Sequence, residues 1–550
     1  MKKYVMLSFL GGLLSLSAVA EEENIYQQNI GKTSKTKEYP LGSIQHRYNF
    51  EALIPPQCYT KTHGDFNPCY TCHQDQPKKE GRSNRQFDAD LQGEYSFSDV
   101  GVRNHWRNLF KDRSEAVNAI SDDAILQYIN ADNFSPLAAK LASKDWKGYV
   151  PKLANLHLGD EAFDEKGLAK DGSQWVAFNY KPLPSTFWPT NGSTDDVMIR
   201  LPAIYYTNSK GEINNDIYYL NLAIAEAAIK DFATIAVLPF DEKMIGLDLN
   251  GDGELSVIKQ INRPSHYVGA AKEEKVENFL YPTGTEFLHT VRYVGVDEQG
   301  NIYNAPRMKE VRYMVKYRYM SKRLLGVAFD EEYQDKYEGN LPRVPWLGDR
   351  GIDNKFGWWM QGFIEDEHGD LRKQGFEETF FCAGCHGTIG SVIDSTFSFT
   401  RKVDGPEGWG YIDLRKMADA PSYGETKGEI LQYLERVGGG NEFRQNEEIQ
   451  QKYFNNGQLD VEKVLAAKNI YELITPSRER ALALNKAYRL IVEEQSFLEG
   501  RDATIVPSVN VFDEVDPEKA PVLPEDRQFS YDLRLDWKPS RTAAQHGLPR

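Results

Sequence analysis

A five-residue pattern, Cys-x-x-Cys-His, occurs twice in this chain and limits the folds open to it. The copies run from Cys69 to His73 and from Cys382 to His386, so their histidines are 313 positions apart (386 − 73). With five cysteines and ten histidines in 550 residues, chance predicts roughly 0.0008 copies. Composition therefore does not explain the pattern, and the fold has to hold two distant segments in surroundings that suit their chemistry.

The pattern is the attachment signature of c-type haem. Two thiols three residues apart lie about one helical turn apart, so each can add to one haem vinyl group, and the next histidine can ligate the iron. Before the first copy, Asn67 and Pro68 predict the start of a helix. Zinc held by four cysteines and a redox dithiol are the alternatives, and the histidine after each pair favours haem. The sequence thus predicts two covalently bound haem c groups, held by Cys69, Cys72 and His73 and by Cys382, Cys385 and His386.

A sixth iron ligand would decide whether each haem only carries electrons or also binds a small molecule. His105 and His63 are the candidates for the first haem, with a low potential expected from histidine ligation. His289 is a candidate for the second haem, as is Met417, 31 residues after His386. Cys58 is the leftover cysteine, and a free thiol and a thiolate near the first haem are both open readings.

The segment Asp248 to Ser256 resembles the start of a calcium-binding loop. Oxygen ligands stand at positions one, three and five, and glycine stands at position six. Position twelve is Lys259 instead of glutamate, so a complete EF-hand is excluded, and an acidic turn is the equal alternative. The predicted calcium ligands are Asp248, Asn250, Asp252 and Glu254.

The N-terminus predicts export. Lys2 and Lys3 precede an apolar run from Val5 to Leu16, and Ala18-Val19-Ala20 is a signal-peptidase pattern. The run is shorter than the ~20 residues of a membrane span, and no cysteine follows it to carry a lipid. We expect a cleaved signal peptide and a periplasmic product. Cleavage removes two lysines, so the charge falls from −16 to 63 − 81 = −18, which makes nucleic acid a poor partner.

The fold class predicted is α+β. A signal peptide (1–20) precedes a helical N-terminal haem-binding region (21–145), a mixed, β-rich central region (146–375) and a helical C-terminal haem-binding region (376–550). Strands are expected over Glu286–Val296 and, from the alternation of apolar and basic residues, over Val311–Met320. Helices are expected over Ser121–Asn130, over Leu220–Phe232 and from Thr475-Pro476 onward. No later stretch is long and apolar enough to be a transmembrane span.

On these motifs the chain resembles dihaem c-type cytochromes. The stretches Thr285–Val294, Phe356–Asp366 and Gly408–Leu414 also resemble a family of long, exported bacterial dihaem cytochromes of unassigned reaction. The resemblance implies electron transfer in the periplasm, with redox proteins or a small molecule as partners. The alternative is a dihaem oxidoreductase with one open, peroxidase-like or small-molecule-oxidising haem, and a third hypothesis is a non-catalytic module that docks a partner.

Overall fold

The structure is a computed structural model that describes residues 49, 51–74, 92–98, 100–338, 344–439, 442–529 and 532–538. The predicted signal peptide, residues 1–20, lies outside the described residues. Among the helices of these ranges, none is both long and apolar enough to cross a bilayer.

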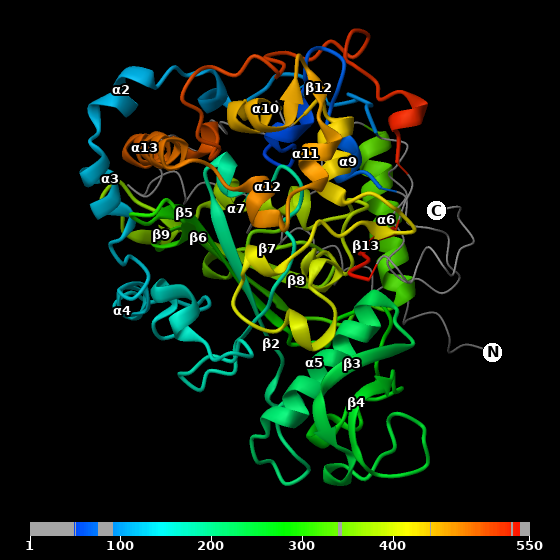
Figure 1. Cartoon of the computed structure of the whole chain (residues 1–550). Helices are drawn as coiled ribbons and strands as arrows, with labels where there is room; N and C mark the ends of the chain where they lie inside the picture. Colours follow the sequence, from blue (N-terminus) through cyan, green and yellow to red (C-terminus); the bar gives the residue numbers. More distant parts are fainter. Residues whose placement is uncertain are drawn as a thin grey trace, which may run out of the picture.

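An antiparallel sheet of seven strands runs through the centre of the molecule (Figure 1). The strand order is β1-β2-β5-β6-β8-β7, and β9 also pairs with β8. Pairing places Val197, His289, Arg312 and Gly362 in one row across four neighbouring strands. The strands are β1 (Val176–Ala177), β2 (Thr194–Arg200), β5 (Glu286–Val296), β6 (Ile302–Lys316), β7 (Ile352–Asp353), β8 (Trp358–Glu365) and β9 (Leu371–Lys373).

Helices and short two-stranded ribbons surround the sheet. The ribbons are β3 (Thr234–Asp241) with β4 (Val257–Asn262), β10 (Ser422–Tyr423) with β13 (Asp532–Leu535), and β11 (Phe454–Asn455) with β12 (Gln458–Leu459). The helices are α2 (Ser114–Ala119), α3 (Asp122–Ile129), α4 (Leu137–Ala142), α5 (Asn215–Lys230), α6 (Lys322–Tyr337), α7 (Phe376–Cys385), α8 (Ser398–Arg401), α9 (Glu429–Arg436), α10 (Glu447–Tyr453), α11 (Val461–Leu465), α12 (Ile470–Ile474) and α13 (Arg478–Glu494).

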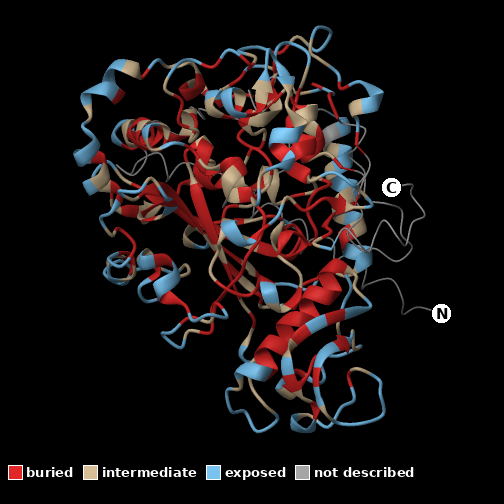
Figure 2. Ribbon diagram, in the orientation of Figure 1, coloured by how far each residue is buried: buried red, intermediate tan, exposed pale blue. Residues whose placement is uncertain are grey.

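Both faces of the sheet are covered, so the strands are more apolar than a half-exposed sheet requires. On one face Met198, Leu288 and Val311 pack in a core with Leu137 of α4. At the lower end of Figure 1, α5 and the β3–β4 ribbon form a lobe in which α5 is buried along almost its whole length (Figure 2). The alanine-rich sequence of α5 lets neighbouring chain segments approach it closely on all sides.

The predicted α+β class is confirmed, and several predicted elements form where the pattern places them. β5 has the predicted bounds, and Ser121 caps α3 by accepting a hydrogen bond from the backbone N–H of Ala124 (3.2 Å). Other boundaries differ. α5 begins at Asn215, five residues before the prediction, because Asn214 is its N-cap. β6 begins at Ile302 and ends at Lys316, since its pairing with β5 extends back to the turn.

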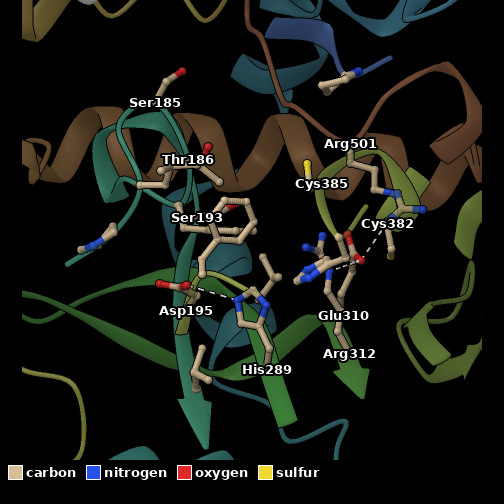
Figure 3. Close-up of a pocket in the computed structure, with 18 of the residues that line it drawn as sticks. Ser185, Thr186, Ser193, Asp195, His289, Glu310, Arg312, Cys382, Cys385 and Arg501 are labelled. Atoms are coloured by element: carbon tan, nitrogen blue, oxygen red, sulfur yellow. Dashed lines mark hydrogen bonds and ion pairs between the residues drawn. The ribbon is translucent and has the colours of Figure 1, made fainter. Parts of the chain in front are cut away.

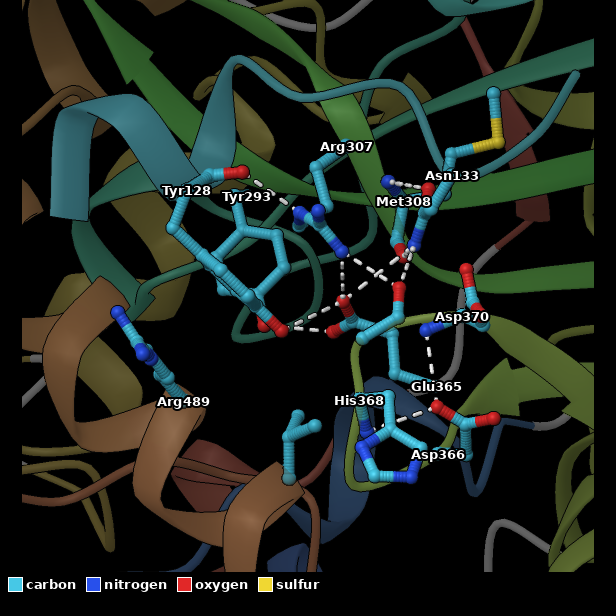
Figure 4. Close-up of polar contacts among 12 residues, drawn as sticks. Tyr128, Asn133, Tyr293, Arg307, Met308, Glu365, Asp366, His368, Asp370 and Arg489 are labelled. Carbon is cyan, nitrogen blue, oxygen red and sulfur yellow. Dashed lines mark hydrogen bonds and ion pairs between the residues drawn. The ribbon is translucent and has the colours of Figure 1, made fainter. Parts of the chain in front are cut away.

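A buried carboxylate ties α3 to the sheet (Figure 4). Glu365 of β8 is fully buried and accepts hydrogen bonds from the hydroxyls of Tyr128 (3.0 Å) and Tyr293 (2.6 Å) and from Arg307 (3.1 Å). Burial is the main influence on this carboxyl and raises its pKa to about 7, despite the neighbouring guanidinium. Four elements (α3, β5, β6 and β8) therefore meet at one titratable group.

Candidate functional site

A cavity of about 250 Å³ lies on the other face of the sheet, between the strands and residues of α7 and α13. Along β6 the lining includes Glu310, Arg312 and Met314, which alternate as successive side chains of a strand do, and their neighbours Lys309 and Tyr313 also contribute. Register places Asp195 and Val291 beside Glu310, so three strands contribute one row of the wall. Figure 3 shows this wall with the thiols of α7 at one end and Ser185, Thr186 and Ser193 at the other.

The surface of the cavity is mainly apolar, and eight charged residues also contribute to its lining. Such a lining, with a few polar groups that converge, is typical of small-molecule sites. Large apolar and aromatic contributors are Phe178, Tyr180, Phe187, Trp188, Phe287, Met314, Met360, Phe381 and Phe397. The charged contributors are Asp195, Lys309, Glu310, Arg312, Arg401, Arg444, Arg501 and Asp502.

Arg312 differs from the other cavity arginines in how its guanidinium is used. Its Nε donates to Glu310 (3.0 Å), whereas Nη1 and Nη2 donate to no protein group in the described part of the chain. Arg501 also donates to Glu310 (2.9 Å). Burial alone would raise the pKa of Glu310, but the two guanidinium groups outweigh it and lower that pKa to about 2. The remaining arginines have carboxylate partners: Arg401 pairs with Glu429, and Arg444 pairs with Asp502.

His289 is held against the cavity by a carboxylate. Its Nε2 lies 3.1 Å from Oδ2 of Asp195, and the hydroxyl of Tyr180 donates to the same carboxylate. The rings of His289 and Phe187 are nearly perpendicular, with 5.0 Å between centroids. A histidine oriented by a buried carboxylate keeps a fixed ring position and tautomer. The predicted residue His289 therefore lies in the cavity wall, together with an acidic partner that the sequence did not reveal.

The second Cys-x-x-Cys-His copy forms the last turn of α7. Cys382 and Cys385 line the cavity, and burial raises the pKa of both thiols, that of Cys385 to about 11. His386, which ends the helix, shares a hydrogen bond of 2.8 Å between its Nδ1 and the carbonyl oxygen of Ser395. Burial lowers the pKa of His386 to about 4, so its ring is neutral at pH 7 and Nε2 stays available as a ligand atom.

The first copy lies at the same cavity. Asn67 accepts a hydrogen bond from the backbone N–H of Cys69 (3.0 Å) and starts a short 3-10 helix, Cys69–Thr71, where an α-helix was expected. Cys72 lines the cavity, and its carbonyl oxygen accepts from the backbone N–H of Ser391 (3.1 Å), which follows the second copy. Cys58 is half-buried: desolvation raises the pKa of its thiol, and the charges of Cys69 and Cys385 add to the effect. The fold thus brings the two copies together.

The other candidate iron ligands, His63, His105 and Met417, do not line the cavity. His63 is exposed and His105 is partly buried. Met417 is 1% exposed and packs in a separate core with Ile430 and Ile470. Of the four candidates, only His289 shares the cavity with a Cys-x-x-Cys-His histidine, His386, and the sixth ligands stay a prediction.

The predicted calcium loop is an exposed turn between β3 and β4. Asp248 accepts from the backbone N–H groups of Gly251 (2.6 Å) and Gly253 (2.8 Å), and the amide of Asn250 donates to Asp252 (2.8 Å). These bonds use the oxygens within the turn, and Glu254 is exposed. Across the described ranges, no group of three or more histidine, cysteine or acidic side chains is placed to share a metal ion. Calcium at this loop stays a prediction.

Sequence reasoning missed Asp195, Ser193 and Lys309. The sequence places Arg312 on the basic side of the predicted strand. A half-buried strand would turn that side to solvent, so Arg312 was not predicted to line a cavity. The wall became apparent only when strand pairing joined β2, β5 and β6. Period-two alternation predicts which residues share a face and does not predict what covers that face.

Comparison with known proteins identifies relatives without a known activity. Residues 42–470 match a family described as “-like lipoprotein”. An uncharacterized lipoprotein of Aquifex aeolicus is 31% identical over 552 residues, which cover 90% of this chain and 92% of that protein. No solved structure matches the chain.

These matches correct the central prediction from the sequence. The assignment to dihaem c-type cytochromes is wrong, as are the electron-transfer function and the dihaem oxidoreductase alternative that depended on it, because both the family and the relative are lipoproteins with no indication of either activity. The assignment rested on two five-residue segments and three short stretches, whereas the family match spans 429 positions (470 − 42 + 1). The two haem c groups and the calcium ion stay predictions. With more than half of its length matched to one family and a relative aligned along nine-tenths of it, this chain belongs to the lipoprotein-like family.

Proposed function

We propose that this chain is an exported protein that binds, in its central cavity, a mainly apolar small molecule with a carboxylate group. The lipoprotein family supports export, and the signal-peptidase pattern at Ala18 to Ala20 supports release into the periplasm. The apolar lining supplies the free energy of binding, since each buried CH₂ group contributes about 0.8 kcal/mol. The few charged groups then select and orient the molecule.

The observation that carries the proposal is the guanidinium of Arg312. It is a partly buried cation, with 20% of its side chain exposed, in a mainly apolar cavity, and its two Nη atoms have no acceptor among the described residues. A polar group in such surroundings is costly unless it is hydrogen-bonded. A ligand carboxylate satisfies both Nη atoms at once, because the guanidinium fork matches the two oxygens of a carboxylate.

The thiol end of the cavity offers groups that could attach a bound molecule covalently. Cys382, Cys385 and Cys72 lie on the wall beside the neutral ring of His386. Haem meets the class proposed here, since it is flat and mainly apolar and carries two carboxylates. We therefore propose haem c, attached through the Cys-x-x-Cys-His thiols, as an occupant of this end. This proposal concerns a bound group only and assigns no electron-transfer role.

Binding is tested with the full chain produced without haem-ligation machinery. In calorimetric titrations we expect dodecanoate to bind at least 10-fold more tightly than dodecanol, which has the same chain length and no carboxylate. Arg312→Met should remove that difference and leave dodecanol binding unchanged. Arg318→Met, an exposed arginine just beyond β6, is the matched control and should behave as the parent protein. Equal affinities of the parent for the two probes would reject the proposal.

The haem proposal is tested by expressing the protein in the periplasm together with haem-ligation machinery. Thioether-bound haem should survive acid-acetone extraction and give a pyridine haemochrome spectrum. Cys382→Ser should lower the haem content relative to the parent, whereas an equally well produced but colourless parent protein would reject haem as the occupant.

A further inference from the structure

A serine and a lysine meet at the end of the cavity opposite the thiols. The Nζ atom of Lys309 lies 3.1 Å from the Oγ atom of Ser193, and both residues line the cavity. Lys309 is 2% exposed, and its Nζ also donates to the carbonyl oxygen of Gly192 (2.6 Å). Figure 3 shows Ser193 on the wall formed by β2, close to the labelled Asp195. A hydroxyl and an amine at this separation have the geometry of a nucleophile and its base.

Local irregularities of the fold produce this meeting. Gly192 precedes Ser193 in a left-handed conformation (φ +94°), and a Cβ added there would lie 3.1 Å from the Cβ of Leu484 in α13. Lys309 lies on β6, which pairs with β5. Val291 of β5 pairs with Glu310, and Arg292 pairs with Met308, so Lys309 is the extra residue of a β-bulge. A bulge re-aims a side chain and is common beside active sites. Without it, alternation would direct Lys309 away from Glu310 and the cavity.

The surroundings of Lys309 favour the neutral amine. Burial dominates and lowers its pKa to about 7, although the carboxylates of Glu365, Asp502 and Glu310 act in the opposite direction. None of these carboxylates is within ion-pair distance of Nζ, judged over the described residues. Nζ also lies 4.0 Å from the centroid of Tyr488 and 5.0 Å from that of Tyr293, and these ring faces act with the carboxylates in favour of the charged form.

We propose that Ser193 and Lys309 form a nucleophile–base pair that hydrolyses apolar esters bearing a free carboxylate. The inference rests on the proposed function, because Arg312 would hold the carboxylate while the ester lies at Ser193. The Oγ atom attacks the acyl carbon, and its proton passes to Nζ of Lys309. The C–O bond to the alcohol breaks, and the alcohol leaves with that proton. Water then attacks the acyl-serine, again with Lys309 as base, and releases the acid and free Ser193.

The experiment compares two ester probes on the full, purified chain. The mono-p-nitrophenyl ester of adipic acid has the required carboxylate, and p-nitrophenyl hexanoate lacks it. We expect hydrolysis of both, with a kcat/KM at least 10-fold higher for the adipate ester. Ser193→Ala and Lys309→Arg should each lower both rates by about 10²-fold or more, the range of a general base. Ser143→Ala, which removes an exposed hydroxyl just after α4 and outside the cavity lining, should retain the parent rate.

Two further readouts separate a nucleophile from a structural hydroxyl. A fluorophosphonate should add covalently to Ser193, as found by peptide mass spectrometry, and Lys309→Arg should slow that addition. The parent rate should rise with pH and reach half its maximum near pH 7, because the neutral form of Lys309 is the base. Absence of hydrolysis and of an adduct at Ser193, in protein that still binds dodecanoate, would overturn this inference and leave the proposed function intact. Loss of the adipate preference in Arg312→Met with hexanoate hydrolysis retained would support both.

Discussion

Arg292 on β5 forms a fully buried ion pair with Asp196 of β2. Its side chain is fully buried, and the guanidinium contacts Asp196 (2.9 Å) and the carbonyl oxygen of Leu156 (2.7 Å). Asp196 is 1% exposed and also accepts hydrogen bonds from Thr290 and Tyr411. The pair therefore connects β2 and β5 to the segment before β1. Removing one partner leaves the other charge buried without its counter-ion.

We expect Arg292→Met to lower the free energy of unfolding by about 3–5 kcal/mol, the usual cost of breaking a buried ion pair. Guanidinium denaturation followed by tryptophan fluorescence measures the change. Lys463→Met removes an exposed lysine that pairs with Asp460 and should shift the midpoint little. Similar midpoints for the two variants would show that Asp196 is satisfied by its hydroxyl partners alone.

At the scale of elements, Glu365 makes the junction of α3 with the sheet sensitive to pH. Its pKa is about 7 in the folded chain and 4.5 in the reference state, so the folded chain binds the proton more tightly (Figure 4). The resulting stabilisation is complete below pH 4.5 and is lost as pH rises through 7. At about 1.4 kcal/mol for each pKa unit, the loss reaches about 3 kcal/mol.

We therefore expect the melting temperature of the parent protein to fall between pH 5 and pH 8, and Glu365→Gln to reduce that fall. Glu367→Gln changes an exposed carboxylate two residues away and serves as the control. Scanning calorimetry at both pH values gives the comparison. The same pH dependence in Glu365→Gln as in the parent would assign it to other groups.

The elements that the sequence predicted well are those set by neighbouring residues. Ser121 capped its helix, and β5 had the expected bounds, because capping and alternation are local. The candidate site was predicted only at its cysteines and histidines. Asp195 contacts His289 across 94 positions, and the bulge at Lys309 exists only in the pairing of β6 with β5. Neither the Asp195–His289 contact nor the bulge can be predicted from a short segment of sequence.

At the scale of the whole molecule, the prediction concerns the mature N-terminus. We expect cleavage after Ala20, so the exported protein should begin at Glu21 and carry a formal charge of −18. N-terminal sequencing and the intact mass of protein from the periplasmic fraction measure both. Ala20→Arg should slow cleavage, because the signal peptidase requires a small residue there, whereas Glu23→Gln should not. A full-length protein with Met1 retained after export would contradict the assignment.

The hydrogen bond from Ser391 to Cys72 has a consequence for how the protein is made. It joins residues 319 positions apart (391 − 72), so a chain crossing the membrane N-terminus first exposes Cys58, Cys69 and Cys72 well before Ser391 follows. Contacts of such long separation form late in folding. The compartment beyond the membrane is oxidising, and exposed thiols there form disulfides. Closing this contact therefore competes in time with oxidation of the N-terminal thiols, which the C-terminal half partly covers when it arrives.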